Sequence, residues 1–236
     1  MSAPVTYARV AGVLFLVSLV AGGFGEGFAP AQLIVSGDAA ATAHNVAASD
    51  ALFRAGFAGY LVEGMCDAAL TVILYVLLRP VDRALALFAV VFRILATATF
   101  AFAELFYVVP SLLVGNDSYL GSFTTAQRDS LALLAFNVYG VGGEVSLAFY
   151  GAGSIFVGYL MYRSTYVPRV LGALWVLGGL CFVARTFSFV LAPAYSPVIL
   201  QVPMVLAILL LSLWFLVRGV DATKWEARAR AVHGAP

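Results

Sequence analysis

The fold of this chain follows from residues 52–78, which read LFRAGFAGYLVEGMCDAALTVILYVLL. A helix rises about 1.5 Å per residue, so this apolar run is long enough to cross a hydrocarbon core of ~30 Å. Three charged residues interrupt the run, namely Arg54, Glu63 and Asp67. A charge at bilayer depth costs about 3 kcal/mol even on the mild insertion scale, so it normally faces the interior of a helical bundle. The stretch therefore predicts a membrane span that carries functional side chains.

The rest of the chain repeats this pattern. Five further apolar segments lie at about 9–29, 84–113, 131–162, 169–192 and 197–217. Of the 236 residues, 63% are hydrophobic and 11% are charged, whereas a soluble domain carries about 25% charged residues. The first segment starts like a signal peptide but continues to Phe28, so we interpret it as an uncleaved helix. The sequence predicts an all-α fold, a six-transmembrane-helix bundle that forms one integral-membrane domain over residues 1–236.

The basic residues predict how this bundle is oriented. In a six-span topology, one side of the membrane receives Arg9, Arg79, Arg83, Arg163, Arg169, Arg218, Lys224, Arg228 and Arg230. The other side receives Arg54 and Arg128. Because cytoplasmic loops carry the excess of lysine and arginine, both termini are expected in the cytoplasm. The two long connections, residues 30–51 and 114–130, are then expected outside.

Several short motifs resemble a known family. They are GDAAAT at residues 37–42, ALFR at 51–54, LLRPV at 77–81, Phe92-Arg93, and GYLMYR at 158–163. With these motifs, nearly the whole chain resembles a bacterial membrane family catalogued as domain of unknown function 4386. The resemblance implies a six-span helical protein of the bacterial cytoplasmic membrane. It implies no activity, so no catalytic residue is transferred from it.

Composition and motifs exclude several functions. The net charge of +1 and the lack of a basic patch argue against a nucleic-acid partner. No phosphate-binding loop, dinucleotide glycine pattern or His-Glu-x-x-His motif is present, and we expect no cofactor. His44 and His233 both lie outside the predicted spans, which argues against an intramembrane metal site. Cys66 and Cys181 lie within spans and are expected to pack as small apolar residues.

The charged residues of the spans are the main functional signal. They are Glu26, Glu63, Asp67, Glu104 and Glu144, with Arg54, Arg93 and Arg185. Counting ~1.5 Å per residue from the cytoplasmic arginines places the four glutamates and Arg185 in the outer third of the membrane, and Asp67 and Arg93 near its middle. Glu63 and Asp67 are four residues apart and share a helix face. Any of these residues could form a structural ion pair. Acids outnumber bases, however, so the surplus must be protonated, hydrated or matched by a cation or a substrate.

Our leading hypothesis is metal-independent acid–base chemistry on a lipophilic small molecule, in a polar and aromatic pocket of the outer half of the membrane. By analogy, small integral-membrane terpene cyclases use this set of side chains. The hypothesis makes Glu63 the general acid and Asp67 its partner or base, and Arg93 and Arg185 the groups that tune them. The expected substrate-binding residues are Glu26, Tyr60, Glu104, Asn137, Tyr139, Glu144 and Arg185.

Two other functional classes use the same residues. A proton- or cation-coupled small-molecule transporter would relay protons through the carboxylates. A non-catalytic membrane binding protein would use the charges as structural ion pairs. The expected partners are therefore the lipid bilayer and either a lipophilic small molecule or a proton or other cation. The sequence determines neither the class, nor the substrate, nor the oligomeric state.

Overall fold

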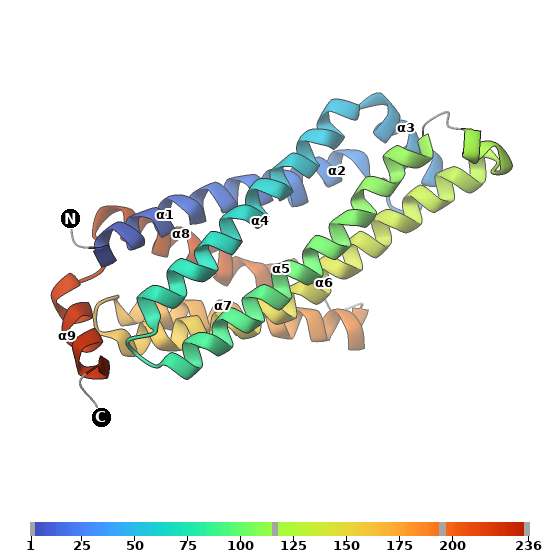
Figure 1. The fold of residues 1–236 in the computed structure, drawn as a ribbon. Coiled ribbons are helices and arrows are strands. Elements are labelled where there is room, and N and C mark those ends of the chain that lie inside the picture. Colours follow the sequence, from blue (N-terminus) through green and yellow to red (C-terminus); the bar gives the residue numbers. More distant parts are fainter. Residues whose placement is uncertain (1–2, 115–117, 194–196, 234–236) are drawn as a thin grey trace. The chain divides into compact units, whose positions relative to one another are not determined.

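A computed structural model describes residues 3–114, 118–193 and 197–233. All regular elements within these residues are helical. In chain order they are α1 (Ala3–Gly22), the π-helix η1 (Gly23–Phe28), α2 (Ala29–Leu33), α3 (Ala39–Ala48), α4 (Asp50–Leu78), α5 (Arg83–Val114), the short 3₁₀-helix η2 (Ser118–Ser122), α6 (Thr125–Ser164), α7 (Arg169–Leu191), the 3₁₀-helix η4 (Val198–Gln201), α8 (Val202–Val217) and α9 (Ala222–His233) (Figure 1).

Six stretches of the described chain are long and apolar enough to cross a membrane. They are Ala3–Leu33, Asp50–Leu78, Arg83–Val114, Thr125–Ser164, Arg169–Leu191 and Val198–Val217. The prediction of an all-α bundle with six membrane-spanning helices is confirmed. The sidedness of the chain in the membrane stays a prediction.

Polar side chains mark where several helices begin. The Asp38 carboxylate accepts a hydrogen bond from the Ala41 N–H at 2.9 Å at the start of α3. The Asp82 carboxylate accepts one from the Leu85 N–H at 3.0 Å at the start of α5. Because the first N–H groups of a helix have no partner inside it, each such cap stabilises the helix by about 1 kcal/mol.

Contacts between residues divide the chain into two compact units. Unit 1 comprises residues 1–19, 65–97 and 144–236, and unit 2 comprises residues 20–64 and 98–143. The long helices α1, α4, α5 and α6 each contribute residues to both units. Figure 1 shows α5 and α6 running side by side, and the ring contacts agree, with Phe88 stacked on Phe156 in unit 1 and Phe100 against Tyr139 in unit 2.

Glycines hold α6 and α7 together in unit 1. A Cβ atom added to Gly151 would lie 2.6 Å from the Gly179 carbonyl oxygen, and one added to Gly179 would lie 2.6 Å from the Gly151 carbonyl oxygen. The same reciprocal contact joins Gly158 and Gly172, at 2.7 Å in both directions. Gly151 and Gly158 are seven residues apart on α6, and Gly172 and Gly179 are seven residues apart on α7. The four glycines therefore form one line of contact between the two antiparallel helices. Small residues let helices approach closely in a membrane, where the hydrophobic effect does not drive their association.

In unit 1, side chains of the C-terminal helix and of the connection between α6 and α7 bind carbonyl groups at helix ends. The Leu77 carbonyl, at the end of α4, accepts hydrogen bonds from the Tyr166 hydroxyl at 2.6 Å and from the Trp225 indole N–H at 3.0 Å. The Arg228 guanidinium donates to the Arg163 carbonyl at 2.7 Å. Burial raises the pKa of Tyr166, so its phenol keeps the proton that it donates. Terminal carbonyls of two helices are thus satisfied by side chains from another segment.

Unit 2 also relies on glycines for close packing. A Cβ atom added to Gly25 would lie 2.7 Å from the Gly56 carbonyl oxygen, and one added to Gly59 would lie 2.9 Å from the Ala21 carbonyl oxygen. The first span therefore lies directly against α4 here, backbone on backbone. This close approach determines where the acidic side chains of both helices meet.

Candidate acid–base site in unit 2

Glu26 lies on the π-helix η1, within the sequence GFGEGF. A π-helical turn inside an α-helix is rare and often marks a functional site. The Glu26 side chain is exposed on the surface of unit 2. One turn earlier, Gly22 contacts the Glu63 carboxylate, and any side chain at position 22 would collide with it. The glycines around the π-turn therefore bring the acids of the first span and of α4 to the same place.

Glu104, on α5, is the most buried acid of this unit, with 2% of its surface exposed. It interacts electrostatically with Glu63, and it lies close enough to Tyr60, Tyr107 and Tyr139 to interact with each of them. Tyr60 and Tyr139 also interact with Glu26 and Glu63. The three glutamates and the two tyrosines thus form one cluster, which we call the acidic cluster.

Tyr60 and Tyr139 of the acidic cluster belong to a closed circuit of aromatic contacts. The ring of Phe57 contacts that of Tyr60, with centroids 6.0 Å apart, and Tyr60 meets Phe100 edge-on at 5.3 Å. Phe100 contacts Tyr139 at 6.2 Å, and Tyr139 meets Tyr107 at 5.4 Å. Tyr107 then stacks on Phe57 at 6.4 Å, which closes the circuit. The rings are buried or half-buried, so they form an apolar, aromatic part of unit 2 that includes two members of the acidic cluster.

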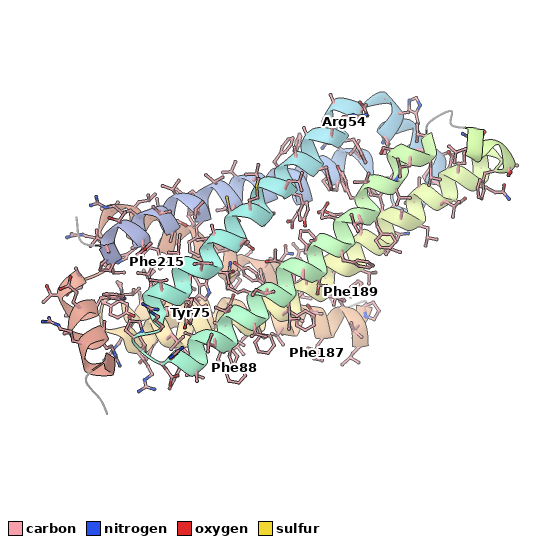
Figure 2. The ribbon with its side chains drawn as sticks, viewed as in Figure 1. Arg54, Tyr75, Phe88, Phe187, Phe189 and Phe215 are labelled. Atoms are coloured by element: carbon pink, nitrogen blue, oxygen red, sulfur yellow. The ribbon has the colours of Figure 1, made fainter. Side chains whose placement is uncertain are left out.

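Basic residues are far from this cluster along the helices of unit 2. The arginines of the unit are Arg54 and Arg128, which lie in the first two turns of α4 and α6. Arg54 is exposed and pairs with Asp50 at 2.7 Å (Figure 2). Carboxylates crowded together away from water disfavour one another's charge.

In unit 1, the acidic residues of the spans form ion pairs with arginines. Asp67 on α4 pairs with Arg93 on α5, with 3.3 Å between Oδ1 and Nη2. Arg93 is 2% exposed, donates from Nε to the Thr71 hydroxyl at 3.0 Å, and lies over the Tyr150 ring, 5.0 Å from its centroid. A buried guanidinium needs such partners, because an uncompensated charge at this depth is costly. The sequence left open whether Asp67 and Arg93 form an ion pair. The structure shows that they do.

The second ion pair of unit 1 joins α6 to α7. The Arg185 guanidinium donates to both carboxylate oxygens of Glu144, with 3.0 Å between Nε and Oε2. The neighbouring Thr186 hydroxyl donates to the Glu144 carbonyl at 2.7 Å. Two adjacent residues of α7 therefore fix one residue of α6, which sets the register of the two helices.

A family model described as a domain of unknown function (DUF4386) matches residues 10–219. The chain belongs to this family. No curated protein and no solved structure matches it. The family resemblance expected from the sequence is confirmed.

The structure of this DUF4386 protein divides the residues that the sequence placed in one site. Glu26, Tyr60, Glu63, Glu104 and Tyr139 come together in unit 2. Four others form two ion pairs of unit 1, namely Asp67, Arg93, Glu144 and Arg185. Asn137 belongs to unit 2, and its side chain is exposed. Among the described residues, no group of three or more His, Cys, Asp or Glu side chains is placed to hold a metal ion.

Two features of the acidic cluster were missed by sequence reasoning. Tyr107, next to the cluster, is not among the substrate-binding residues predicted from the sequence, although it follows Glu104 by three positions and therefore shares its helix face. The π-turn is the second feature, since the sequence predicts ordinary helix there. The alternation of glycines in Gly22-Gly23-Phe24-Gly25-Glu26-Gly27 was the available signal, since glycine weakens the regular helix and removes side chains that would block Glu63.

Proposed function

We propose that the acidic cluster of unit 2 performs metal-independent acid–base chemistry on a lipophilic small molecule, as an isomerase or cyclase does. One observation carries the proposal: Glu26, Glu63 and Glu104 meet around Tyr60 and Tyr139, in a unit whose arginines lie at helix ends. A carboxylic acid that keeps its proton near neutral pH can act as a general acid.

Each residue of the cluster has a role in this proposal. Glu63 is the general acid, because its side chain is half-buried and therefore both shielded and reachable. It adds a proton to a carbon–carbon double bond of the substrate, and a neighbouring carbon then loses a proton to the cluster. No bond to oxygen forms and no electron is gained or lost, so the reaction needs no co-reactant. The aromatic faces of Tyr60, Phe100 and Tyr139 stabilise the cation that forms in between.

The ion pairs of unit 1 have a different role. Sequence reasoning grouped Asp67 and Arg93 with Glu63 as catalytic residues. We propose instead that Asp67–Arg93 and Glu144–Arg185 hold helices in register, since each acid already binds its own guanidinium. This leaves proton exchange to the residues of unit 2.

The protonation state can be tested before a substrate is known. Infrared spectra of the purified protein in a maltoside detergent at neutral pH should show the carbonyl band of a protonated carboxylic acid, shifted by heavy water. Glu63→Gln and Glu104→Gln should each weaken it, and Glu226→Gln, at an exposed position of α9, should not. A spectrum without this band at neutral pH contradicts the proposal.

Activity is then tested with polyisoprenoid alkenes in heavy water. An acid of this kind places deuterium on the recovered alkene or its isomer, which mass spectrometry detects. Glu63→Gln should abolish the incorporation, because the amide keeps the shape of the acid without a transferable proton.

A second function has one observation in its favour. Exposure decreases through the cluster, from exposed Glu26 to half-buried Glu63 and buried Glu104. Such a gradient would suit a proton relay in a proton-coupled carrier. Proteoliposomes that contain a pH-sensitive dye distinguish the two functions: a carrier moves protons down an imposed gradient, and an enzyme does not.

A further inference from the structure

The ends of the membrane spans meet α9 at one end of unit 1. The hydrogen bonds of the Leu77 carbonyl join α4 to the α6–α7 connection and to α9. The Asp221 N–H donates to the Tyr166 carbonyl at 3.3 Å, and Gly219, after α8, lies against Val5 of α1. Figure 1 shows α9 at the same end of the unit as the start of α1. Each candidate span of the described chain has one terminus here, so this end lies at a boundary between membrane and water.

Basic side chains gather at this end, although no basic run marks them in the sequence. The helix ends and connections that meet here carry nine of them, and we call these residues the basic end: Arg9, Arg79, Arg83, Arg163, Arg169, Arg218, Lys224, Arg228 and Arg230. The same segments carry three acids, Asp82, Asp221 and Glu226. Nine basic and three acidic residues leave a formal net charge of +6. The fold therefore concentrates positive charge at a membrane surface, in a chain whose total charge is +1.

Three arginines of the basic end are held at the connection between α6 and α7. Arg163, near the end of α6, lies over the Tyr159 ring with Cζ 5.7 Å from its centroid, and its Nη1 donates to the Tyr159 hydroxyl at 3.3 Å. Arg169, at the start of α7, lies over the Tyr162 ring, also at 5.7 Å. Arg228 of α9 donates from Nη1 to the Arg163 carbonyl at 2.7 Å. Since a guanidinium has five N–H donors, most donors of this group remain available to a ligand.

The chemistry of this group fits a phosphate. Arginine binds phosphate oxygens through two parallel hydrogen bonds, and a ring beneath the guanidinium holds its plane in place. Neither Arg163 nor Arg169 forms an ion pair with a carboxylate that the structure describes. Glu226 is two residues from Arg228 on α9, and side chains two apart on a helix do not face each other. The arginines are therefore placed to receive an anion.

The neighbouring surface favours a phosphate that carries acyl chains. Tyr159 and Tyr162 are both more than one-third exposed, and tyrosine is typical of the headgroup level of a membrane. An apolar face of α7 begins beside Arg169, with exposed Val170 and, seven residues later on the same face, exposed Leu177. A soluble phosphate would contact only the arginines, whereas a phospholipid also packs its chains along this face. A lipid with no net charge would leave the positive charge uncompensated, so an anionic lipid fits best.

We propose that Arg163, Arg169 and Arg228 bind the phosphate of an anionic phospholipid, whose acyl chains lie along α7. One headgroup then joins three helices, because the arginines come from α6, α7 and α9. The site belongs to unit 1 and is independent of the function proposed for unit 2. It also goes beyond the general excess of basic residues on one side of a membrane protein, since it assigns the headgroup to three particular arginines.

The test titrates phosphatidylglycerol and phosphatidylcholine with identical acyl chains into the full-length, delipidated protein in maltoside detergent. Native mass spectrometry measures the bound lipid, and phosphatidylglycerol should bind more tightly. Replacing Arg163 and Arg169 together by glutamine should lower the phosphatidylglycerol affinity by about tenfold or more, because charge-assisted hydrogen bonds are lost. The matched control replaces Arg79 and Arg83 together by glutamine. Both are exposed residues of the basic end, so the same charge is removed outside the site, and the affinity should fall far less.

Further arms separate a built site from diffuse attraction. Arg163→Lys with Arg169→Lys keeps both charges but removes the planar donors, so this variant should also bind phosphatidylglycerol more weakly than wild type. Thermal melting confirms that each variant is folded, and the lysine variant carries the test if the glutamine variant does not fold.

Three results would overturn the proposal. Equal binding of the two lipids would show that the headgroup charge is not recognised. Equal losses in the two glutamine variants would show that the lipid responds to overall charge and not to these arginines. Displacement of the lipid by inorganic phosphate at equal concentration would show that the site takes a soluble anion.

Discussion

The two units of this protein use acidic residues in opposite ways. In unit 1, Asp67 and Glu144 each bind a buried arginine, and both pairs join neighbouring helices. In unit 2, Glu26, Glu63 and Glu104 gather around tyrosines, in a unit whose arginines lie at the ends of helices. In the function that we propose, a carboxylate of a span is a structural ion where it binds a guanidinium, and it holds a proton where it lies beside other carboxylates.

The largest expected effect is the loss of an ion pair in unit 1. Arg185→Ala leaves the Glu144 carboxylate without its partner inside the span, which should lower the free energy of unfolding by about 3–5 kcal/mol. Denaturation of the purified protein in detergent measures this. Arg54→Ala is the control, because Arg54 and Asp50 form an exposed pair, and the loss of a solvent-exposed pair should change stability far less. Equal losses for the two variants would remove the structural role that we assign to Glu144–Arg185.

Close packing at glycines should contribute similarly to the stability of both units. Gly172→Ala in unit 1 and Gly59→Ala in unit 2 each place a methyl group within 3 Å of backbone atoms. Overpacking of this kind should destabilise either variant by about 1–3 kcal/mol in the same denaturation experiment. Gly140→Ala is the control, since nothing lies within 4 Å of the added atom. If only the unit 1 variant loses stability, then the units differ in packing as well as in charge.

Glu63→Gln should change stability little. The amide keeps the shape of the acid and, like the protonated acid, carries no charge beside Glu104, so the free energy of unfolding should stay within about 1 kcal/mol of wild type. Thermal melting in detergent measures this alongside the deuterium incorporation described above. A melting temperature that falls as far as that of Arg185→Ala would show that Glu63 is structural, and the contrast between the units would disappear.

The smallest effect concerns Asp221, which begins α9 outside the spans. The Lys224 N–H donates to its carboxylate at 3.1 Å, and this hydrogen bond lowers the pKa of Asp221. A lowered pKa in the folded state means that the charged cap stabilises α9 above the pKa of the unfolded chain. That stabilisation is lost as the pH falls through the folded value. The protection of α9 amides from hydrogen exchange, relative to an unfolded chain at the same pH, should therefore decrease at acid pH, and Asp221→Asn should remove most of this pH dependence. An unchanged pH dependence in the variant would mean that another group controls it.

The six spans could be predicted because hydropathy is a local property. A run such as residues 52–78 must be helical in a membrane whatever its neighbours are, since the backbone has no other way to satisfy its polar groups. The family, the helices and the charged candidates all followed from such runs and from short motifs. Even so, α6 begins at Thr125, several residues before the predicted boundary, because Thr124 and Gln127 cap each other reciprocally in polar sequence.

The partner of each charge could not be predicted, because it depends on how helices are rotated and spaced. Glu63 and Asp67 lie four residues apart on one helix and were therefore assigned to one site, yet contacts place them in different units. Asp67 binds a residue 26 positions away, and Glu144 binds one 41 positions away. Sequence alone determined that this protein is a membrane bundle with more acids than bases in its spans. Tertiary structure decided which acids are neutralised, since only the register and approach of neighbouring helices, through glycines and a π-turn, bring a given carboxylate to an arginine or to other carboxylates.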